Sequence, residues 1–393
     1  MTDWSDKMMA PPGMPRKPGP GKARLASKYR ACLLGGAAGD ALGAPVEFLR
    51  EREIQARFGP GGIRDFAKAF DRVGAITDDT QMTLFTAEGL LRGLVRLKHR
   101  GIGPAFESVT ANAYLRWLRT QGMHPRSKEV ELRDDQGNEA WLMSHAELHH
   151  RRAPGNTCIS ALEAMKSLGD PARNESKGCG GLMRIAPVAL FVHANWTGDP
   201  AALPDYCFDL GCSLAGITHG HPSGQLPAGV MSLVMLRILQ GADLPASIEE
   251  ARALLRGRPD NEETMIAIEN AERLAGLDLT FGRAIAELGE GWVAEEALAI
   301  ALYCVLTART LEEGVIAAVN HDGDSDSTGA IAGNLLGLMH GEAAIPARWL
   351  DQLELRDVIG DIAEDLLMCN EWEIGEYIDS EENRYYWKRY PGF

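Results

Sequence analysis

Acidic and hydroxyl side chains crowd into residues 320–329, directly before a run of small and apolar residues. Asp322, Asp324 and Asp326 would repel one another if all three were ionised within a few ångströms, so such a cluster has raised pKa values or binds a cation. The simpler alternative is an acidic turn that caps a helix, with Asp326 or Ser325 at the N-cap. This segment alone does not separate the two interpretations.

A second acidic cluster favours the cation. Thr77, Asp78 and Asp79 stand before apolar residues at helical spacing, so they too open a helix. A carboxylate at a helix N-terminus is favourable, but capping needs only one. The surplus acids and hydroxyls, with neither soft thiolates nor a histidine pair beside them, are typical ligands of hard ions such as Mg2+. The two clusters together therefore indicate a site for two divalent ions.

The composition limits the possible classes of protein. The 393 residues are 45% hydrophobic and carry a formal net charge of −15, which supports a large core and argues against sequence-independent nucleic-acid binding. The seven cysteines include no C-x-x-C pair, which is typical of reduced intracellular thiols. The longest apolar runs are too short to span a membrane, and the first residues lack the apolar stretch of a signal peptide. We expect a cytoplasmic protein with neither a nucleic-acid nor a membrane partner.

Helical periodicity dominates the chain, whereas the alternation typical of strands is scarce. The fold class expected is therefore all-α, a compact bundle of many helices. Residues 122–155 are polar and poorly periodic, which predicts a long loop beside the site. The pattern predicts helices over residues 26–44, 80–98, 105–119, 158–167, 206–217, 225–240, 261–275, 293–307, 311–319, 327–340 and 357–369.

Proline and glycine fill the first 24 residues, together with several basic side chains. Such a composition does not form a regular helix, so residues 1–24 are predicted to be an extended or disordered arm. Residues 25–393 are predicted to form a single domain. The arm is either an unimportant tail or a segment that orders on a partner protein.

Two of the expected helices carry glycine at every fourth position. Each glycine costs roughly 1 kcal/mol relative to alanine inside a helix. Three on one face therefore need a compensating reason, and close approach of two backbones is the usual one. We expect these helices in the centre of the bundle, with Asp40 and Glu47 near Asp324 and Asp326. The glycines are Gly35, Gly39 and Gly43 in the first helix, and Gly329, Gly333 and Gly337 in the second.

Five segments carry a recognisable pattern: GAAGDALGAPVEF at 36–48, TDDT at 77–80, KGCGGLMRIAP at 177–187, THGH at 218–221 and NHDGDSDS at 320–327. Together they resemble the ADP-ribosylglycohydrolase family over about residues 27–370. The resemblance implies an all-α bundle with two Mg2+ or Mn2+ ions in a central binuclear cleft. The implied activity is hydrolysis of the glycosidic bond between ADP-ribose and a protein side chain.

The resemblance also assigns roles to single residues. Glu47 corresponds to the family's mobile glutamate, which bridges metal or acts as acid or base. Ser327 stands where the family often has threonine, and it keeps the oxygen. Asp322 stands where many members have a small or neutral residue, so its role is open, and it could be an outer partner of the ligands. The implied metal ligands are Thr77, Asp78, Asp79, Asp324, Asp326 and Ser327.

Glycosidic cleavage needs an oriented water, a base and help for the leaving group. Two metal ions can orient the ribose diol and activate water, and either Glu47 or Asp78 could take the proton. The glycine segment can present backbone N–H groups to a diphosphate. The resemblance implies these substrate-binding residues: Ser176, Lys177, Gly178, Cys179, Gly180, Gly181, Met183 and His219.

Other conspicuous side chains have simpler expected roles. Arg184 is expected to pair with a carboxylate beneath the site, and His221 to be structural. Residues 149–152, with the sequence HHRR, are predicted to form a solvated basic edge, which could also face an acidic protein. The aromatic residues 385–390 are predicted to pack on the core.

The leading interpretation is a binuclear metal-dependent hydrolase that removes ADP-ribose from protein side chains, with arginine as the linked residue. An alternative keeps the site and changes the linkage to serine, an acetyl ester or another small ADP-ribosyl compound. A different class is an immunity protein that neutralises an ADP-ribosyltransferase toxin by occluding it. Residues 1–24 would then contact the toxin.

Overall fold

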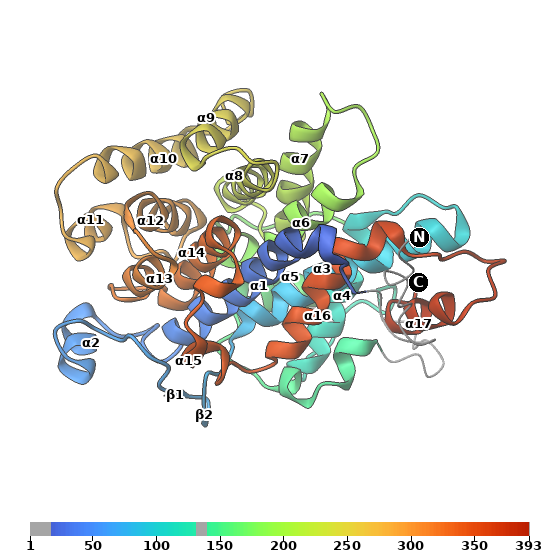
Figure 1. Ribbon diagram of the computed structural model, residues 1–393, viewed down its shortest axis with the longest axis horizontal. Coiled ribbons are helices and arrows are strands. Elements are labelled where there is room, and N and C mark those ends of the chain that lie inside the picture. The colour runs from blue at the N-terminus through green and yellow to red at the C-terminus, as the bar shows by residue number, and fades with distance from the viewer. Residues whose placement is uncertain (1–16, 131–139, 393) are drawn as a thin grey trace, which may run out of the picture.

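Helices form almost all of the regular structure in the computed structural model, which describes residues 17–130 and 140–392 (Figure 1). The all-α prediction is therefore confirmed. One antiparallel hairpin joins β1 (Lys68–Ala69) to β2 (Arg72–Val73). The α-helices are α1 (Ala23–Gly43), α2 (Glu51–Phe58), α3 (Asp78–Arg100), α4 (Phe106–Thr120), α5 (Asn156–Ala164), α6 (Ala186–Asn195), α7 (Leu203–Gly216), α8 (Pro222–Leu239), α9 (Leu244–Leu255), α10 (Glu262–Ala275), α11 (Phe281–Leu288), α12 (Ala294–Thr307), α13 (Leu311–Val319), α14 (Ser325–His340), α15 (Ala347–Leu350), α16 (Arg356–Met368) and α17 (Glu381–Arg389). The 3-10 helices are η1 (Pro20–Lys22), η2 (Trp141–Ser144), η3 (Ala146–His149), η4 (Cys179–Gly181), η5 (Glu342–Ala344) and η6 (Cys369–Glu371).

The two glycine-rich helices, α1 and α14, lie against each other in the middle of the molecule (Figure 1). Their backbones touch: a β-carbon added to Gly39 would lie 2.0 Å from the carbonyl oxygen of Gly329. A β-carbon added to Gly333 would lie 2.1 Å from the carbonyl oxygen of Gly35. Only glycine permits this approach, so the packing predicted from the glycine spacing is confirmed.

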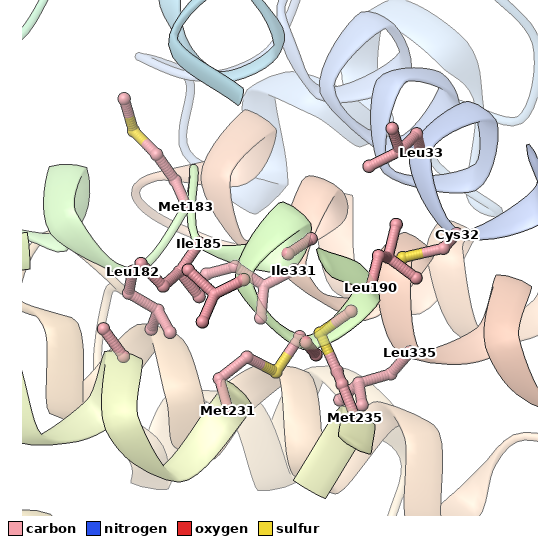
Figure 2. Packing of buried hydrophobic residues seen from close by; sticks show 14 of the residues in the cluster. Cys32, Leu33, Leu182, Met183, Ile185, Leu190, Met231, Met235, Ile331 and Leu335 are labelled. Carbon is pink, nitrogen blue, oxygen red and sulfur yellow. The ribbon is translucent and has the colours of Figure 1, made fainter. Parts of the chain in front are cut away.

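Apolar side chains from helices far apart in sequence fill the space around this pair. Figure 2 shows α1, α6, α8 and α14 meeting through the labelled residues Cys32, Leu190, Met231, Met235, Ile331 and Leu335. All six are at most 1% exposed. Fully burying one such side chain contributes roughly 1.5–3 kcal/mol, so this core holds the central pair rigidly.

A buried ion pair anchors the chain just before α3. Arg152 donates to Glu354 through Nη2 at 2.9 Å, and Glu354 also accepts from the backbone N–H of Ile76 at 3.1 Å. Arg152 is only 4% exposed. The predicted basic edge at residues 149–152 is therefore wrong for this arginine, whereas His149, His150 and Arg151 are exposed.

All eleven predicted helices are present, with ends shifted by up to three residues. The sequence pattern missed α2, α6, α9, α11, α15 and α17. Most of these are short, and short segments such as EREIQARF in α2 offer too few apolar positions to define a periodicity. The predicted loop at 122–155 contains only η2 and η3 among the residues described there, 122–130 and 140–155.

The predicted N-terminal arm lies mostly outside the described residues. Its last part is helical, because η1 begins at Pro20 and α1 at Ala23. At the other end of the chain, Tyr386 and Tyr390 are fully buried, with ring centroids 3.7 and 5.7 Å from that of Trp372. Packing of the aromatic C-terminus is thus confirmed. Among the described residues, no helix combines the length and apolar character that crossing a membrane requires.

Candidate active site

Both acidic segments lie at the N-termini of long buried helices. Thr77 is the N-cap of α3, and its Oγ1 accepts from the backbone N–H of Asp79 at 3.3 Å. The N-cap of α14 is Asp324, whose side chain makes no capping hydrogen bond. The alternative of an acidic turn with Asp326 or Ser325 at the N-cap is therefore wrong, and capping does not explain the carboxylates at α14.

Five carboxylates line one cleft of about 200 Å3, and we call them the acidic wall: Glu47, Asp78, Asp79, Asp324 and Asp326. Oxygens of Glu47, Asp324 and Asp326 lie within 4.8 Å of one another. Ser327 also lines the cleft. Thr77 does not line it, but its Oγ1 donates to Asp79 Oδ2 at 3.3 Å from the buried side.

The acidic wall is electrostatically strained. Burial, followed by repulsion from Asp324, raises the pKa of Glu47 to about 9. Burial is also the main cause that raises the pKa of Asp78 to about 8. Burial and neighbouring carboxylates hold the pKa values of Asp79 and Asp326 well above their usual range. The wall therefore holds protons at neutral pH unless a cation replaces them.

Asp40 lies beneath this wall and is fully buried in α1. Its two oxygens accept from the backbone N–H of Thr77 at 3.0 Å, and Oδ2 also accepts from the N–H of Thr80 at 3.1 Å and from the Thr80 hydroxyl. Burial raises the pKa of Asp40 to about 6, against these hydrogen bonds. Asp40 thus fixes the first turn of α3 onto α1, a role that its sequence position had not indicated.

The donor set fits hard divalent cations. Asp79 Oδ1 is buried and has no hydrogen-bond partner among the described residues, which is costly for a carboxylate oxygen. A cation would satisfy it and would also relieve the repulsion within the acidic wall. A thiol lies next to this donor set, because Cys179 Sγ lies 2.8 Å from Asp324 Oδ2 and donates to it. The residues present therefore fit metal ions of the Mg2+ or Mn2+ type.

A second surface of the cleft comes from η4, its flanks and the connection between α7 and α8. We call it the glycine wall: Gly178, Cys179, Gly180, Met183 and His219. These are five of the eight predicted substrate-binding residues. Two backbone N–H groups expected to face a diphosphate are used inside the protein, because Gly178 donates to Ser176 Oγ at 3.3 Å and Cys179 to the Trp292 carbonyl at 3.2 Å.

The other three predicted residues stand behind the glycine wall and do not line the cleft. Ser176 Oγ is 2.9 Å from Thr157 Oγ1. Lys177 Nζ pairs with Glu263 at 2.5 Å, and Gly181 packs on Ala215, with a hypothetical β-carbon 2.8 Å from that of the alanine. The lining residues that sequence reasoning missed come from the 122–155 loop, the start of α5 and the turn before α12: Ala153, Gly155, Asn156, Thr157, Cys158 and Trp292.

Arg184 is fully buried, but its predicted carboxylate partner is wrong. Nη2 donates to Thr218 Oγ1 at 2.6 Å and to the Leu214 carbonyl at 3.3 Å. The guanidinium carbon lies 4.2 Å from the centroid of the Tyr114 ring. Within the described parts of the chain no carboxylate forms an ion pair with Arg184, so neutral oxygens and a π-face take that place.

His219 and His221 differ as predicted in their surroundings. His219 lines the cleft and is 1% exposed, and its Nδ1 lies 2.8 Å from Thr218 Oγ1. His221 is the N-cap of α8, and its Nδ1 accepts from the backbone N–H of Ser223 at 3.0 Å. His221 is therefore structural, as expected.

Glu47 is carried on the connection between α1 and α2 and lines the cleft. Next to it, Phe48 is 73% exposed and stacks on Trp292 with ring centroids 5.9 Å apart. Arg50 Nη1 bridges Glu290 Oε1 at 3.0 Å and Asp322 Oδ2 at 3.2 Å. These contacts fasten the Glu47 segment to the turn before α12.

Asp322, whose role the sequence left open, helps to attach the segment that carries Glu47. Its Oδ1 accepts from the backbone N–H of Glu51, the first residue of α2, at 2.6 Å. Asp322 is not among the residues that line the cleft. The backbone hydrogen bond and Arg50 lower its pKa against the effect of partial burial. Asp322 thus caps α2 and remains ionised.

Two acidic helix N-termini and a glycine-rich turn line one cleft of this helical fold. Comparisons with known proteins identify this combination as that of a family of hydrolases. The profile of the ADP-ribosylglycohydrolase family matches residues 21–374, so the chain belongs to that family. It is 25% identical to the ADP-ribosyl-[dinitrogen reductase] glycohydrolase of Rhodospirillum rubrum, over 82% of this chain and 89% of that protein. It is 24% identical to the ADP-ribosylarginine hydrolase Tri1 of Pseudomonas putida (strain GB-1), over 86% of this chain and 77% of that protein.

Among solved structures, an ADP-ribosylglycohydrolase-related protein complex has a similar fold. The TM-score is 0.63 and the sequence identity 27%, and the match covers 88% of this chain and 99% of that chain. The match extends over nearly the whole of that chain, so the arrangement of helices around the acidic wall belongs to a known fold.

Proposed function

We propose that this protein is a divalent-metal-dependent hydrolase that releases ADP-ribose from modified protein side chains, with arginine as the linked residue. The observation that carries the proposal is the acidic wall facing a glycine wall in one buried cleft of a chain of this family. The arginine linkage is supported by the relative named ADP-ribosylarginine hydrolase. The partner would be an ADP-ribosylated protein.

The cleft has oxygen ligands for two ions. Bound there, Mg2+ or Mn2+ would neutralise the carboxylates, orient the ribose hydroxyls and lower the pKa of a bound water. The orphaned Asp79 Oδ1 supports this assignment. The residues proposed to hold the ions are Thr77, Asp78, Asp79, Asp324, Asp326 and Ser327.

Two carboxylates are suited to proton transfer. Glycosidic cleavage passes through an oxocarbenium-like state, in which water loses a proton and the leaving group gains one. Glu47, whose pKa is raised to about 9, holds a proton near neutral pH in the metal-free protein and can give it to the leaving group. Asp78 is held by the backbone N–H of Gly155, which donates to Oδ2 at 3.2 Å. Once bound cations have displaced its proton, either carboxylate can accept the proton of the attacking water, and both are proposed as catalytic.

The glycine wall is proposed to bind the ADP-ribosyl group. Side chains are missing at Gly178 and Gly180, so the backbone there lets a ligand approach closely. His219 lies beside both glycines and offers a polar ring atom. Ser176, Lys177 and Gly181 would then act by shaping this wall from behind.

The first experiment uses the purified full-length chain and a protein that carries ADP-ribosyl-arginine. Released ADP-ribose is measured with Mg2+, with Mn2+ and with EDTA. We expect release with either metal and none with EDTA. A panel of arginine-linked, serine-linked and acetyl-ester-linked ADP-ribose at equal enzyme concentration then tests the linkage.

Two outcomes would contradict the proposal in different ways. Faster release from serine or an acetyl ester would keep the hydrolase and overturn the arginine linkage. No release from any linkage, together with tight binding of an ADP-ribosyltransferase, would favour the alternative of an immunity protein. Deleting residues 1–24 would then test whether the arm makes that contact.

A further inference from the structure

Hydrogen bonds, in addition to packing, hold His219 and the residues next to it in place. Its carbonyl oxygen accepts from Gln225 Nε2 at 2.7 Å. Asn174 Nδ2 donates to the carbonyl of Thr218 at 2.9 Å, and Asn174 Oδ1 accepts from the backbone N–H of Gly220 at 2.9 Å. Backbone hydrogen bonds thus fix the segment on both sides of the histidine, and Thr218 Oγ1 fixes the ring.

Arg184 restricts the hydrogen bonds that the Thr218 hydroxyl can make with His219. A guanidinium can only donate, so Thr218 Oγ1 accepts from Arg184 Nη2 at 2.6 Å. The threonine hydroxyl still has its own hydrogen to give. It can go to His219 Nδ1 at 2.8 Å or to the Ala215 carbonyl at 3.5 Å. The shorter contact favours Nδ1 as the acceptor.

A neutral imidazole that accepts at Nδ1 carries its proton on Nε2. The ring is neutral, because burial and the nearby Arg184 lower the pKa of His219 to about 3. Nε2 lies next to the two glycines of this wall: β-carbons added to Gly178 and Gly180 would lie 3.3 and 3.4 Å from it. In the described part of the chain, no hydrogen bond is made by this nitrogen.

We infer that Arg184 and Thr218 are positioning residues that hold His219 in its Nε2-protonated tautomer, and that this N–H donates to an oxygen of the bound ligand. A phosphate or ribose oxygen of ADP-ribose supplies that acceptor, so the second half of the inference rests on the proposed function. The arrangement gives the cleft a donor without a positive charge. A charged imidazolium would be attracted by the acidic wall and would compete there with cations.

The tautomer can be observed directly by long-range 1H–15N NMR of the full-length, 15N-histidine-labelled protein at pH 7. The spectrum of His219→Gln identifies the signals among the ten histidines. We expect a pyrrole-type shift for Nε2 and a pyridine-type shift for Nδ1 in the wild type. Thr218→Ser keeps the hydroxyl and should keep this pattern. Thr218→Val removes the hydroxyl and should populate the Nδ1-protonated tautomer. A wild-type ring protonated at Nδ1 would overturn the inference even if the valine variant does not fold.

Calorimetry with ADP-ribose tests the contact with the ligand. Thr218→Val should weaken binding about tenfold, the worth of one neutral hydrogen bond, whereas Thr218→Ser should bind like the wild type. Unchanged affinity in a folded Thr218→Val protein whose tautomer has switched would overturn the ligand contact. A wild-type protein that does not bind ADP-ribose would refute the contact and the proposed function together, while the spectra would still decide the tautomer.

Discussion

The two walls of the cleft differ in their electrostatics: the acidic wall gathers carboxylates, whereas the glycine wall is neutral and hydrogen-bonded. The acidic wall places five carboxylates close together, which raises the pKa values of Glu47, Asp78, Asp79 and Asp326, and Asp79 Oδ1 has no hydrogen-bond partner among the described residues. Around the glycine wall, hydrogen bonds hold Arg184, Thr218 and the backbone of His219 in place, and the His219 ring is neutral. One wall therefore has carboxylates that added cations would neutralise, and the other is already organised by hydrogen bonds.

The difference indicates that charge governs cation binding at the acidic wall, whereas shape and fixed donors govern ligand recognition at the glycine wall. An organised neutral wall can recognise a ligand by fixed donors and by close backbone approach. A wall of crowded carboxylates can bind cations, and these carboxylates lose little further hydration because they are already buried. Changes to the two walls should therefore have different signatures in stability and in activity.

The largest effect is expected for Asp326→Asn, which removes a proposed ligand and a repelling charge together. Hydrolysis and Mn2+ affinity should each fall by more than about 100-fold. In EDTA the variant should melt at a higher temperature than the wild type, because a buried carboxylate with a raised pKa has been removed. Activity assays, calorimetry with Mn2+ and thermal melts measure the three quantities.

The matched control is Asp278→Asn, a change of the same charge at an exposed position. It should alter neither metal affinity nor the melting temperature measurably. If Asp326→Asn destabilised the metal-free protein, the acidic wall would not be strained, and the comparison between the two walls would lose its basis.

A smaller effect is expected from Gly333→Ala, which disturbs the contact that places the acidic wall. The added β-carbon would meet the Gly35 carbonyl, so α1 and α14 must separate, at a cost of roughly 3 kcal/mol in the free energy of unfolding. Gly103→Ala is the control, because nothing lies within 4 Å of its added β-carbon. Denaturant unfolding measures both, and equal stabilities would contradict the close approach of the two helices.

The pH dependence of the metal-free protein should reveal the raised pKa of Glu47. The folded protein has a pKa of about 9 there and the unfolded chain one near 4.5, so folding favours the protonated form. This contribution is complete below about pH 4.5 and is lost as the pH rises towards 9. Between pH 5 and 9 in EDTA, the wild type should lose on the order of 5 kcal/mol more than Glu47→Gln, which has no such proton. Parallel curves for the two proteins in chemical denaturation would contradict the raised pKa.

The smallest effect is expected at Asp322, outside both walls. Asp322→Ala removes the acceptor for the Glu51 N–H and should cost about 1 kcal/mol in the free energy of unfolding. Asp322→Asn keeps an acceptor oxygen and should be closer to the wild type. Neither should change Mn2+ affinity by more than a few-fold. A large loss of metal affinity in Asp322→Asn would move this residue into the metal site.

Local sequence patterns were enough to predict the central scaffold. Glycine at every fourth position predicted the contact of α1 and α14, and this contact brings Asp40 and Glu47 near Asp324 and Asp326, as expected. The gathering of acidic residues in one cleft was predictable in part, because carboxylates in excess of capping needs are visible along the chain. Which carboxylate binds which ion is not tested by the structure and stays a prediction.

Contacts between distant segments were not predictable from local patterns. Arg152 pairs with Glu354, 202 positions away, so no pattern near residue 152 signals that it is buried. Arg184 finds hydroxyl, carbonyl and aromatic partners instead of a carboxylate, because the space around it is shaped by α4 and α7. Trp292 belongs to a turn whose place in the cleft depends on the packing of α12.

The backbone contact between α1 and α14 also determines which parts of the molecule can move. With no side chain between Gly39 and Gly329, a slide or tilt of either helix would push one backbone into the other. The two helices therefore move as one body, and their amides should exchange with deuterium only at the slow rate of global unfolding. Opening of the cleft should therefore come from the connections that line it, such as residues 44–50 and 289–293, where exchange should be faster than in α1 and α14.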